Sequence, residues 1–218
     1  MCLILLAWKS VPAQPLVVAA NRDEFHARPA APAKFWEDRP GILGGRDLEA
    51  RGTWMGVSRS GKFAAVTNYR GPQEPRAAES RGALVTRFLD NEMSSSQYVA
   101  GMVPNFHSYS GFNLLACDGE ELWWTSNRGG EPRRLAPGIY GLGNALIDAP
   151  EVDASKQRFA SVLAAGTAVE PLFTVLAAAQ IVNPVYGTRC ATVSIGRRYA
   201  ERSFAPDGSE LDTLQYEF

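Results

Sequence analysis

Short apolar runs separated by tight, glycine-bearing turns dominate this chain, and they limit its fold more than any other feature. Asp118-Gly119 is the clearest such turn, because an Asp-Gly pair between two apolar runs is typical of a β-hairpin. Links this short cannot make the crossover that parallel strands need, so antiparallel pairing is expected. The expected strands are residues 2–9, 15–21, 53–59, 62–69, 112–117, 121–126, 139–142, 190–195 and 199–204.

Two pairs of helices are expected between these strands. In the first pair, Leu84 and Phe88 lie on one face of a helix that Ser80 can cap. In the second pair, Asp153 is the expected cap of one helix, and Pro171 suits the first turn of the other. The expected helices are residues 80–91, 95–102, 153–165 and 171–180.

This order of elements predicts an α+β fold. Two stacked antiparallel sheets, each with a helix pair outside it, would bury every apolar face. The sequence contains no internal repeat and no linker, so residues 1–218 are expected to form a single domain. The proline-containing stretch at 70–79 is expected to be a surface loop at the entrance of a site.

Composition excludes several classes of partner. Hydrophobic residues make up 45% of the chain and the net charge is −1, so no global field draws it to nucleic acid or an anionic membrane. No apolar run approaches the roughly 20 residues of a membrane-spanning helix. The apolar run at 3–8 is too short for a secretory signal. We therefore expect a cytoplasmic protein without a nucleic-acid partner and without membrane insertion.

Metal and disulfide chemistry also lack support in the sequence. Cys2, Cys117 and Cys190 are too few and too scattered for a disulfide framework or a zinc site. His26 and His107 lie far apart without metal-ligand spacing, and a histidine-based triad is hard to build from them. No metal and no cofactor are therefore expected.

Cys2 directly follows the initiator Met1 and precedes an apolar run. Removal of Met1 would leave a residue with both a thiol and a free α-amine. That amine has a pKa of about 7.7–8.0, so it can accept the thiol proton near neutral pH. An N-terminal nucleophile activated by its own amine is a known form of covalent catalysis. The alternative is a small buried residue that leads into a strand.

Four polar residues, Asn21-Arg22-Asp23-Glu24, end the second expected strand. A short hairpin places the end of this strand beside the start of the first, and therefore beside Cys2. A carboxylate there can hold the amine, and an arginine can lower the pKa of the thiol. The alternative is an ordinary solvated turn.

These features resemble the NRDE family, also called the transport and Golgi organisation family. The resemblance extends over nearly the whole chain, and its segments occur in the same order. After Asn21-Arg22-Asp23-Glu24, the segments are Gly44-Gly45-Arg46-Asp47, Gly52-Thr53-Trp54-Met55-Gly56, Thr67-Asn68-Tyr69-Arg70, Ser80-Arg81-Gly82, Tyr140-Gly141-Leu142-Gly143-Asn144-Ala145 and Tyr186-Gly187-Thr188-Arg189.

The NRDE family is similar to the N-terminal-nucleophile (Ntn) hydrolases, especially the bile-salt and penicillin V acylase branch. This resemblance implies a four-layer αββα sandwich with Cys2 as nucleophile and Asp23 at its amine. It implies amide donors to an oxyanion from Asn68 and Asn144, and a thiolate-stabilising charge from Arg189. Each has a structural alternative: a turn asparagine for the two amides, and a surface ion pair for Arg189.

One position departs from the acylase pattern, which has an arginine where this chain has Ala20. Bile salts and penicillins are therefore not carried over as substrates. Arg22 and Glu24 could be site residues particular to the NRDE family or could hold the strand end through ion pairs, and we expect a mixture of both roles. The candidate substrate-binding residues are Asn21, Arg22, Glu24 and Arg46.

The expected function is hydrolysis of a linear amide or a related acyl bond in a small molecule. The first alternative is a non-catalytic carrier that holds haem, acyl-CoA or another lipid in the same cavity, since the family has been connected with such ligands. Haem would then have one weak axial ligand from His26, His107 or Cys2. The second alternative is an interaction protein in membrane trafficking, which the family's name suggests.

Overall fold

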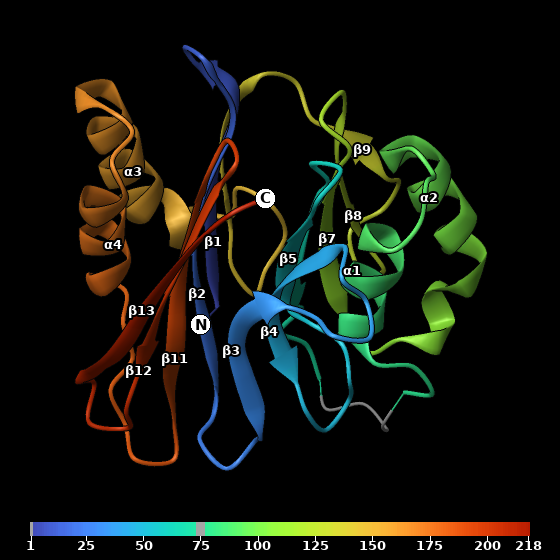
Figure 1. Cartoon of the computed structure of the whole chain (residues 1–218). Coiled ribbons are helices and arrows are strands. Elements are labelled where there is room, and N and C mark those ends of the chain that lie inside the picture. Colours follow the sequence, from blue (N-terminus) through green and yellow to red (C-terminus); the bar gives the residue numbers. More distant parts are fainter. Residues whose placement is uncertain (1, 73–76) are drawn as a thin grey trace. The chain divides into compact units, whose positions relative to one another are not determined.

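The computed structural model describes residues 2–72 and 77–218, and two compact units make up this part of the chain (Figure 1). The first unit contains the residues up to Arg28, Pro137–Gly143 and Ile147–Glu217. The second contains Pro29–Ala136, Asn144–Leu146 and Phe218. Each unit has one sheet in which neighbouring strands are antiparallel, so the predicted α+β class with two antiparallel sheets is confirmed.

In the first unit, the sheet has the strand order β10-β1-β2-β11-β12-β13, and helices α3 and α4 lie along one face of it (Figure 1). Leu5 and Val193 of that face pack against Phe159 and Leu176 of the helices. The elements are β1 (Leu3–Val11), β2 (Gln14–Phe25), β10 (Gly138–Leu142), η2 (Pro150–Val152), α3 (Asp153–Ala165), α4 (Val169–Ala177), β11 (Tyr186–Ile195), β12 (Arg198–Phe204) and β13 (Glu210–Glu217).

The β1–β2 hairpin positions the candidate nucleophile. Its turn contains Ala13, whose φ of 60° is the left-handed backbone of a tight turn. Leu3 pairs with Asn21, so the start of β1 lies beside the end of β2, as predicted. Strand β2 runs four residues beyond its predicted end, because β11 continues to pair with it as far as Phe25.

In the second unit, the sheet has the strand order β3-β4-β5-β6-β7-β8-β9, with α1 and α2 on one face (Figure 1). Leu84 and Phe88 of α1 form a core with Val99 of α2 and Phe112 of the sheet. The elements are β3 (Ala30–Phe35), β4 (Ile42–Asp47), β5 (Met55–Ser58), β6 (Phe63–Asn68), α1 (Arg81–Leu89), α2 (Ser95–Met102), η1 (Val103–Ser108), β7 (Phe112–Cys117), β8 (Leu122–Ser126) and β9 (Arg133–Arg134).

The helix ends differ from the expectations in their capping. Ser80 is the N-cap residue of α1, but its side chain makes no capping hydrogen bond. Asp153 is wrong as a cap, because it is already the first helical residue of α3 and Val152 stands at the cap position. The sequence analysis missed the capping box of α2, in which Ser94 and Gln97 exchange hydrogen bonds.

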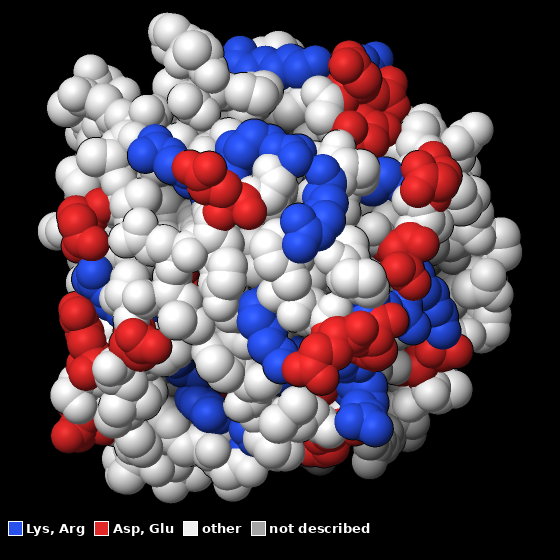
Figure 2. Space-filling model, in the orientation of Figure 1, with Lys and Arg blue, Asp and Glu red and all other residues white. Residues whose placement is uncertain are grey.

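The charged side chains on the face drawn in Figure 2 are mixed, with red and blue groups next to each other in most places. This pattern agrees with the net charge of −1. Within residues 2–72 and 77–218, no helix is long and apolar enough to cross a membrane. Met1 and residues 73–76 of the loop expected at 70–79 lie outside the described residues.

Candidate active site

The thiol of Cys2 and the backbone of Asp23 hold each other through two contacts. The Cys2 thiol donates to the Asp23 carbonyl oxygen, and the Asp23 N–H donates to the Cys2 sulfur, both at 3.4 Å. Cys2 is half-buried and directly precedes the first residue of β1. The hairpin therefore fixes the sulfur beside a carboxylate residue, as the sequence analysis expected.

This environment favours the neutral thiol. Burial and, to a smaller extent, the nearby Asp23 carboxylate raise the pKa of the Cys2 thiol to about 11. The Asp23 N–H and the Arg22 guanidinium act in the opposite direction but do not outweigh burial. In a chain that keeps Met1, the thiol is therefore protonated at neutral pH. Removal of Met1 remains a prediction, because that residue lies outside the described part of the chain.

Asp23 is a buried carboxylate held by strand β11. The Thr188 hydroxyl donates to Asp23 Oδ1 at 2.6 Å, and the Tyr186 hydroxyl donates to the Asp23 carbonyl at 3.2 Å. Thr188 also pairs directly with Asp23 in the β2–β11 register. Sequence reasoning did not assign Tyr186 and Thr188 to the site. The family segment Tyr186-Gly187-Thr188-Arg189 contains both residues. It points to the site only when β11 is known to pair with β2.

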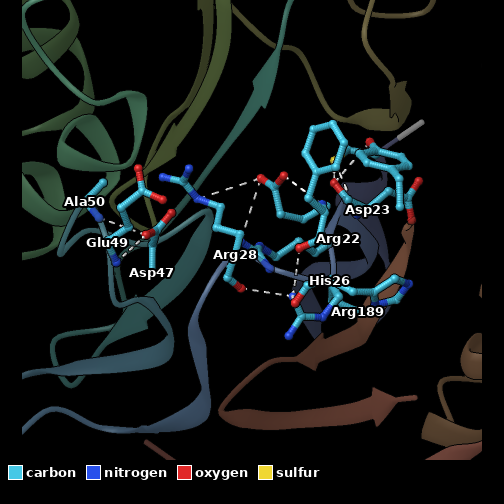
Figure 3. Close-up of polar contacts among 12 residues, drawn as sticks. Arg22, Asp23, His26, Arg28, Asp47, Glu49, Ala50 and Arg189 are labelled. Carbon is cyan, nitrogen blue, oxygen red and sulfur yellow. Dashed lines mark hydrogen bonds and ion pairs between the residues drawn. The ribbon is translucent and has the colours of Figure 1, made fainter. Parts of the chain in front are cut away.

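Arg189 is the extra residue of a bulge in β11, between the pairs that Thr188 and Cys190 make with β2. Its Nη1 donates to the carbonyls of Phe25, His26 and Arg28 at 3.0, 3.3 and 3.1 Å. Figure 3 shows this guanidinium directed at the turn that carries His26 and Arg28.

These contacts let Arg189 fasten the turn after β2. Burial lowers the pKa of the guanidinium, and the nearby Arg22 adds to the effect. The three carbonyls partly compensate the buried charge through charge-assisted hydrogen bonds. The proposed effect of Arg189 on the Cys2 thiolate stays a prediction.

The other polar residues at the end of β2 have defined partners within the first unit. Asn21 Nδ2 donates to the Leu176 carbonyl in α4 at 2.9 Å. Arg22 is buried, and its Nη2 lies 3.9 Å from Glu24 Oε2. The same Glu24 oxygen lies 3.9 Å from Arg28 Nε. Arg22 and Glu24 thus hold the strand end, as one reading of the sequence proposed, and their role toward a substrate stays a prediction.

The second unit brings Asn68 and Asn144 together. Asn144 Nδ2 donates to the Asn68 carbonyl at 2.7 Å, and the Arg70 N–H donates to the Asn144 carbonyl at 2.6 Å. Asn68 is exposed at the end of β6, whereas Asn144 is only 9% exposed. An amide carries two N–H donors, so the one bonded to Asn68 leaves Asn144 with a second. The structure thus places the Asn144 amide next to Asn68, and the role of either amide as a donor to an oxyanion stays a prediction.

Asn113 is the residue that attaches the Asn144 segment to the sheet. It is fully buried on β7, and its Nδ2 donates to the Ala145 carbonyl at 2.9 Å and to Thr67 Oγ1 at 3.2 Å. A buried amide fixed at two points holds the adjacent backbone rigidly. Sequence reasoning missed Asn113, because an asparagine inside an apolar strand gives no local sign of its partner.

Arg46 makes its contacts within the second unit. It forms a bidentate pair with Asp38, at 2.5 and 2.8 Å, and its guanidinium carbon lies 4.3 Å from the Trp36 ring centroid. The next residue, Asp47, accepts the N–H groups of Glu49 and Ala50 through Oδ1, which closes a turn (Figure 3). The charged residues of this motif therefore stabilise local structure, and substrate binding by Arg46 stays a prediction.

Of the two histidines, His26 is half-buried and His107 is exposed. A ring nitrogen of His26, Nε2, lies 3.0 Å from the Asn183 carbonyl, and His107 is exposed in η1. Among the residues that the structure describes, no three histidine, cysteine, aspartate or glutamate side chains are grouped so that they could hold a metal ion.

Comparisons with known proteins agree with the fold and the family resemblance. The family model described as Transport and Golgi organisation 2 matches residues 1–185. The Homo sapiens Transport and Golgi organization protein 2 homolog is 35% identical over 272 residues, which cover 100% of this chain and 99% of that protein.

Two solved structures of hydrolases are similar over almost the whole chain. Penicillin V acylase from Agrobacterium tumefaciens matches with a TM-score of 0.59 at 14% identity, over 99% of this chain and 86% of that one. A variant of conjugated bile acid hydrolase from Clostridium perfringens matches with a TM-score of 0.61 at 10% identity, over 99% and 97%. These neighbours have Ntn-hydrolase folds, and at such identities the likeness shows the fold alone.

Proposed function

Because this chain belongs to the Transport and Golgi organisation 2 family and has an Ntn-hydrolase fold, we propose that it cleaves a linear amide or a related acyl bond with Cys2 as nucleophile. The observation that carries this proposal is the reciprocal contact between the Cys2 thiol and the Asp23 backbone. A thiol fixed at the start of a strand, beside a buried carboxylate, has the surroundings that an N-terminal nucleophile needs.

The proposed reaction starts with removal of Met1. The new α-amine of Cys2 accepts the thiol proton, and Asp23, fixed by Thr188, holds the resulting ammonium. The thiolate attacks the substrate carbonyl, forming a carbon–sulfur bond and an oxyanion that amide donors such as Asn144 stabilise. Collapse breaks the carbon–nitrogen bond, and the ammonium gives its proton to the leaving amine. Water then attacks the thioester with the amine as base, which releases the acid and the free thiol.

An acyl probe tests the nucleophile directly. We expect a thiol-reactive acyl ester to label the processed protein once, and the Cys2→Ala variant not at all. Cys117→Ala is the matched control, because Cys117 is a buried cysteine of the second unit and should not change the labelling. Intact-mass spectrometry identifies both the loss of Met1 and the acyl adduct. Equal labelling of the wild type and Cys2→Ala would remove the nucleophile from the proposal.

A second candidate function applies to a chain that keeps Met1. The raised thiol pKa of about 11 leaves a neutral sulfur there, which suits a carrier of a hydrophobic molecule better than a nucleophile. Titration with haem, followed by absorbance, and with a long-chain acyl-CoA, followed by calorimetry, tests this function. Saturable binding without turnover would support the carrier, and the absence of binding at micromolar protein would exclude it for these ligands.

A further inference from the structure

Tyr186 contacts the same backbone atom as the candidate nucleophile. Its hydroxyl donates to the Asp23 carbonyl oxygen at 3.2 Å, and the Cys2 thiol donates to that oxygen at 3.4 Å. The hydroxyl oxygen and the sulfur are therefore no further apart than these two distances together. All three residues belong to the first unit. A side-chain hydroxyl thus lies close to the atom that would attack a substrate, within one compact unit.

Contacts with both its ring and its backbone fix Tyr186. Tyr186 pairs with Phe25 in the β2–β11 register, and the two rings meet edge to face, with centroids 5.2 Å apart and planes at 76°. The Tyr186 N–H donates to Asn183 Oδ1 at 3.3 Å. An edge-to-face pair is a preferred arrangement of aromatic rings, so it restrains the tyrosine ring. The hydroxyl is therefore held in place before a substrate arrives.

Gly187 allows the loop that carries Asn183 to approach β11. A Cβ atom on Gly187 would lie 2.7 Å from the Ile181 carbonyl oxygen, closer than real Cβ atoms come, and 3.6 Å from the Asn183 nitrogen. Because residue 187 has no side chain, Asn183 Oδ1 can accept the N–H groups of Val185 and Tyr186. The glycine after Tyr186 therefore helps to orient the tyrosine.

The neighbouring side-chain donors have acceptors that they cannot exchange easily. Asn21 Nδ2 is bonded to a backbone carbonyl of α4 in the core. The Thr188 hydroxyl donates to the Asp23 carboxylate, and Arg189 Nη1 donates to three backbone carbonyls. The printed acceptor of Tyr186 is a neutral carbonyl, so its hydroxyl can turn to an acceptor that carries a charge.

We propose that the Tyr186 hydroxyl is a catalytic donor to the oxyanion that forms when Cys2 attacks the substrate carbonyl. Such a donor lies about 2.7–3.1 Å from the developing oxyanion, and a tyrosine hydroxyl can fill this role. When the substrate oxygen becomes charged, the hydroxyl turns about its C–O bond from the Asp23 carbonyl to the stronger, charge-assisted acceptor. Tyr186 keeps its proton and forms no covalent bond. This role rests on the proposed function, and it gives that reaction a donor from the same unit as the nucleophile.

Tyr186→Phe tests the donor, because it removes the hydroxyl and keeps the ring against Phe25. In the processed protein, we expect acylation of Cys2 by a p-nitrophenyl ester to slow about 10²-fold. Alkylation of the same thiol by iodoacetamide builds no oxyanion, so its rate should stay at the wild-type value. The matched control is Tyr199→Phe, which removes a hydroxyl from the same sheet. Tyr199 pairs with Ser194 near the other end of β11, so both rates should stay at the wild-type values.

The outcomes separate this role from the proposed function. Acylation of Tyr186→Phe at the wild-type rate would overturn the role and leave the hydrolase intact. Equal slowing of acylation and alkylation would also overturn it, because Tyr186 would then only hold Asp23 in place. A wild-type protein whose Cys2 is alkylated but never acylated would reject the proposed function itself, and this role with it.

Discussion

Asp23 is the residue of the first unit at which the polar contacts of the candidate site meet. Its backbone holds the Cys2 thiol, and its carboxylate is held by Thr188. Thr188 Oγ1 also accepts the N–H of Ile181 at 2.9 Å, so one buried hydroxyl fixes both the carboxylate and the loop before β11. Because its hydroxyl makes both hydrogen bonds, Thr188 holds the Asp23 carboxylate in one orientation.

Thr188→Val removes this hydroxyl while keeping the side-chain volume. Loss of two partners of a buried hydroxyl should lower the free energy of unfolding by about 1–3 kcal/mol. A weaker hold on Asp23 should slow acyl-probe labelling of Cys2 about tenfold, since about 1.4 kcal/mol of orientation corresponds to a factor of ten. Thr188→Ser keeps the hydroxyl and serves as the control. Labelling of Thr188→Val at the wild-type rate would contradict the role of Thr188.

The pKa of Cys2 makes a prediction about reactivity with iodoacetamide. Extra residues added before Met1 keep Met1 in the chain. In this extended chain, the alkylation rate of Cys2 should rise about tenfold per pH unit from pH 7 toward the thiol pKa of about 11, because only the thiolate reacts. The processed chain should reach its plateau at a lower pH, because the new ammonium favours the thiolate. Intact-mass time courses measure both rates. A plateau by pH 8 in the extended chain would show that burial does not raise this pKa.

At the scale of elements, apolar periodicity and turn residues predicted most strands and helices. Glycine residues inside a strand led to a missed strand. The hairpins were predicted because their turns are short and local in sequence. Strand β4 was missed, since Gly44 and Gly45 look like a break in a strand. Strand β13 was missed because most of its side chains are exposed and none of them is fully buried. Both strands pair with strands that are adjacent in sequence, β4 with β3 and β5, and β13 with β12.

Gly44 lets strand β5 approach β4 closely. A Cβ atom there would lie 2.7 Å from the Met55 carbonyl oxygen and 3.2 Å from the Gly56 Cα, both of which belong to the backbone of β5. Gly44→Ala should therefore force the strands apart and lower the free energy of unfolding by about 1–3 kcal/mol. Gly41→Ala is the matched control, because nothing lies within 4 Å of its added Cβ. Denaturant unfolding measures both variants, and equal stability would contradict the close approach.

At the scale of the whole molecule, the order of elements was predictable but the pairing of distant strands was not. Strand β10 pairs with β1, and neither segment of sequence contains a feature that predicts this pairing. The candidate residues show the same limit. Cys2, Asp23 and Arg189 belong to the first unit, and Asn68 and Asn144 belong to the second. Their action on one substrate is a prediction that comes from the family resemblance and must be tested by function.

Two reactions of the same thiol provide this test. Acylation of Cys2 builds an oxyanion, whereas alkylation by iodoacetamide is a direct displacement that builds none. If Asn144 stabilises the oxyanion, Asn144→Ala should lower the acylation rate of the processed protein about 10²–10³-fold. The same variant should leave the alkylation rate of Cys2 unchanged, because the thiolate itself is unaltered.

The ratio of the two rates separates an oxyanion donor from a residue that only maintains the fold. Asn91→Ala is the matched control, because Asn91 also lies in the second unit and its Nδ2 donates to the Arg87 carbonyl at 2.6 Å. Asn91→Ala loses this contact and also the hydrogen bonds that Asn91 Oδ1 accepts from the Met93 N–H and Lys62 Nζ, so general loosening would slow both reactions at least as much in the control. A selective loss of acylation in Asn144→Ala requires that its amide meets the reacting carbonyl. Equal slowing of acylation and alkylation would instead leave Asn144 as a residue that only holds Asn68 in place.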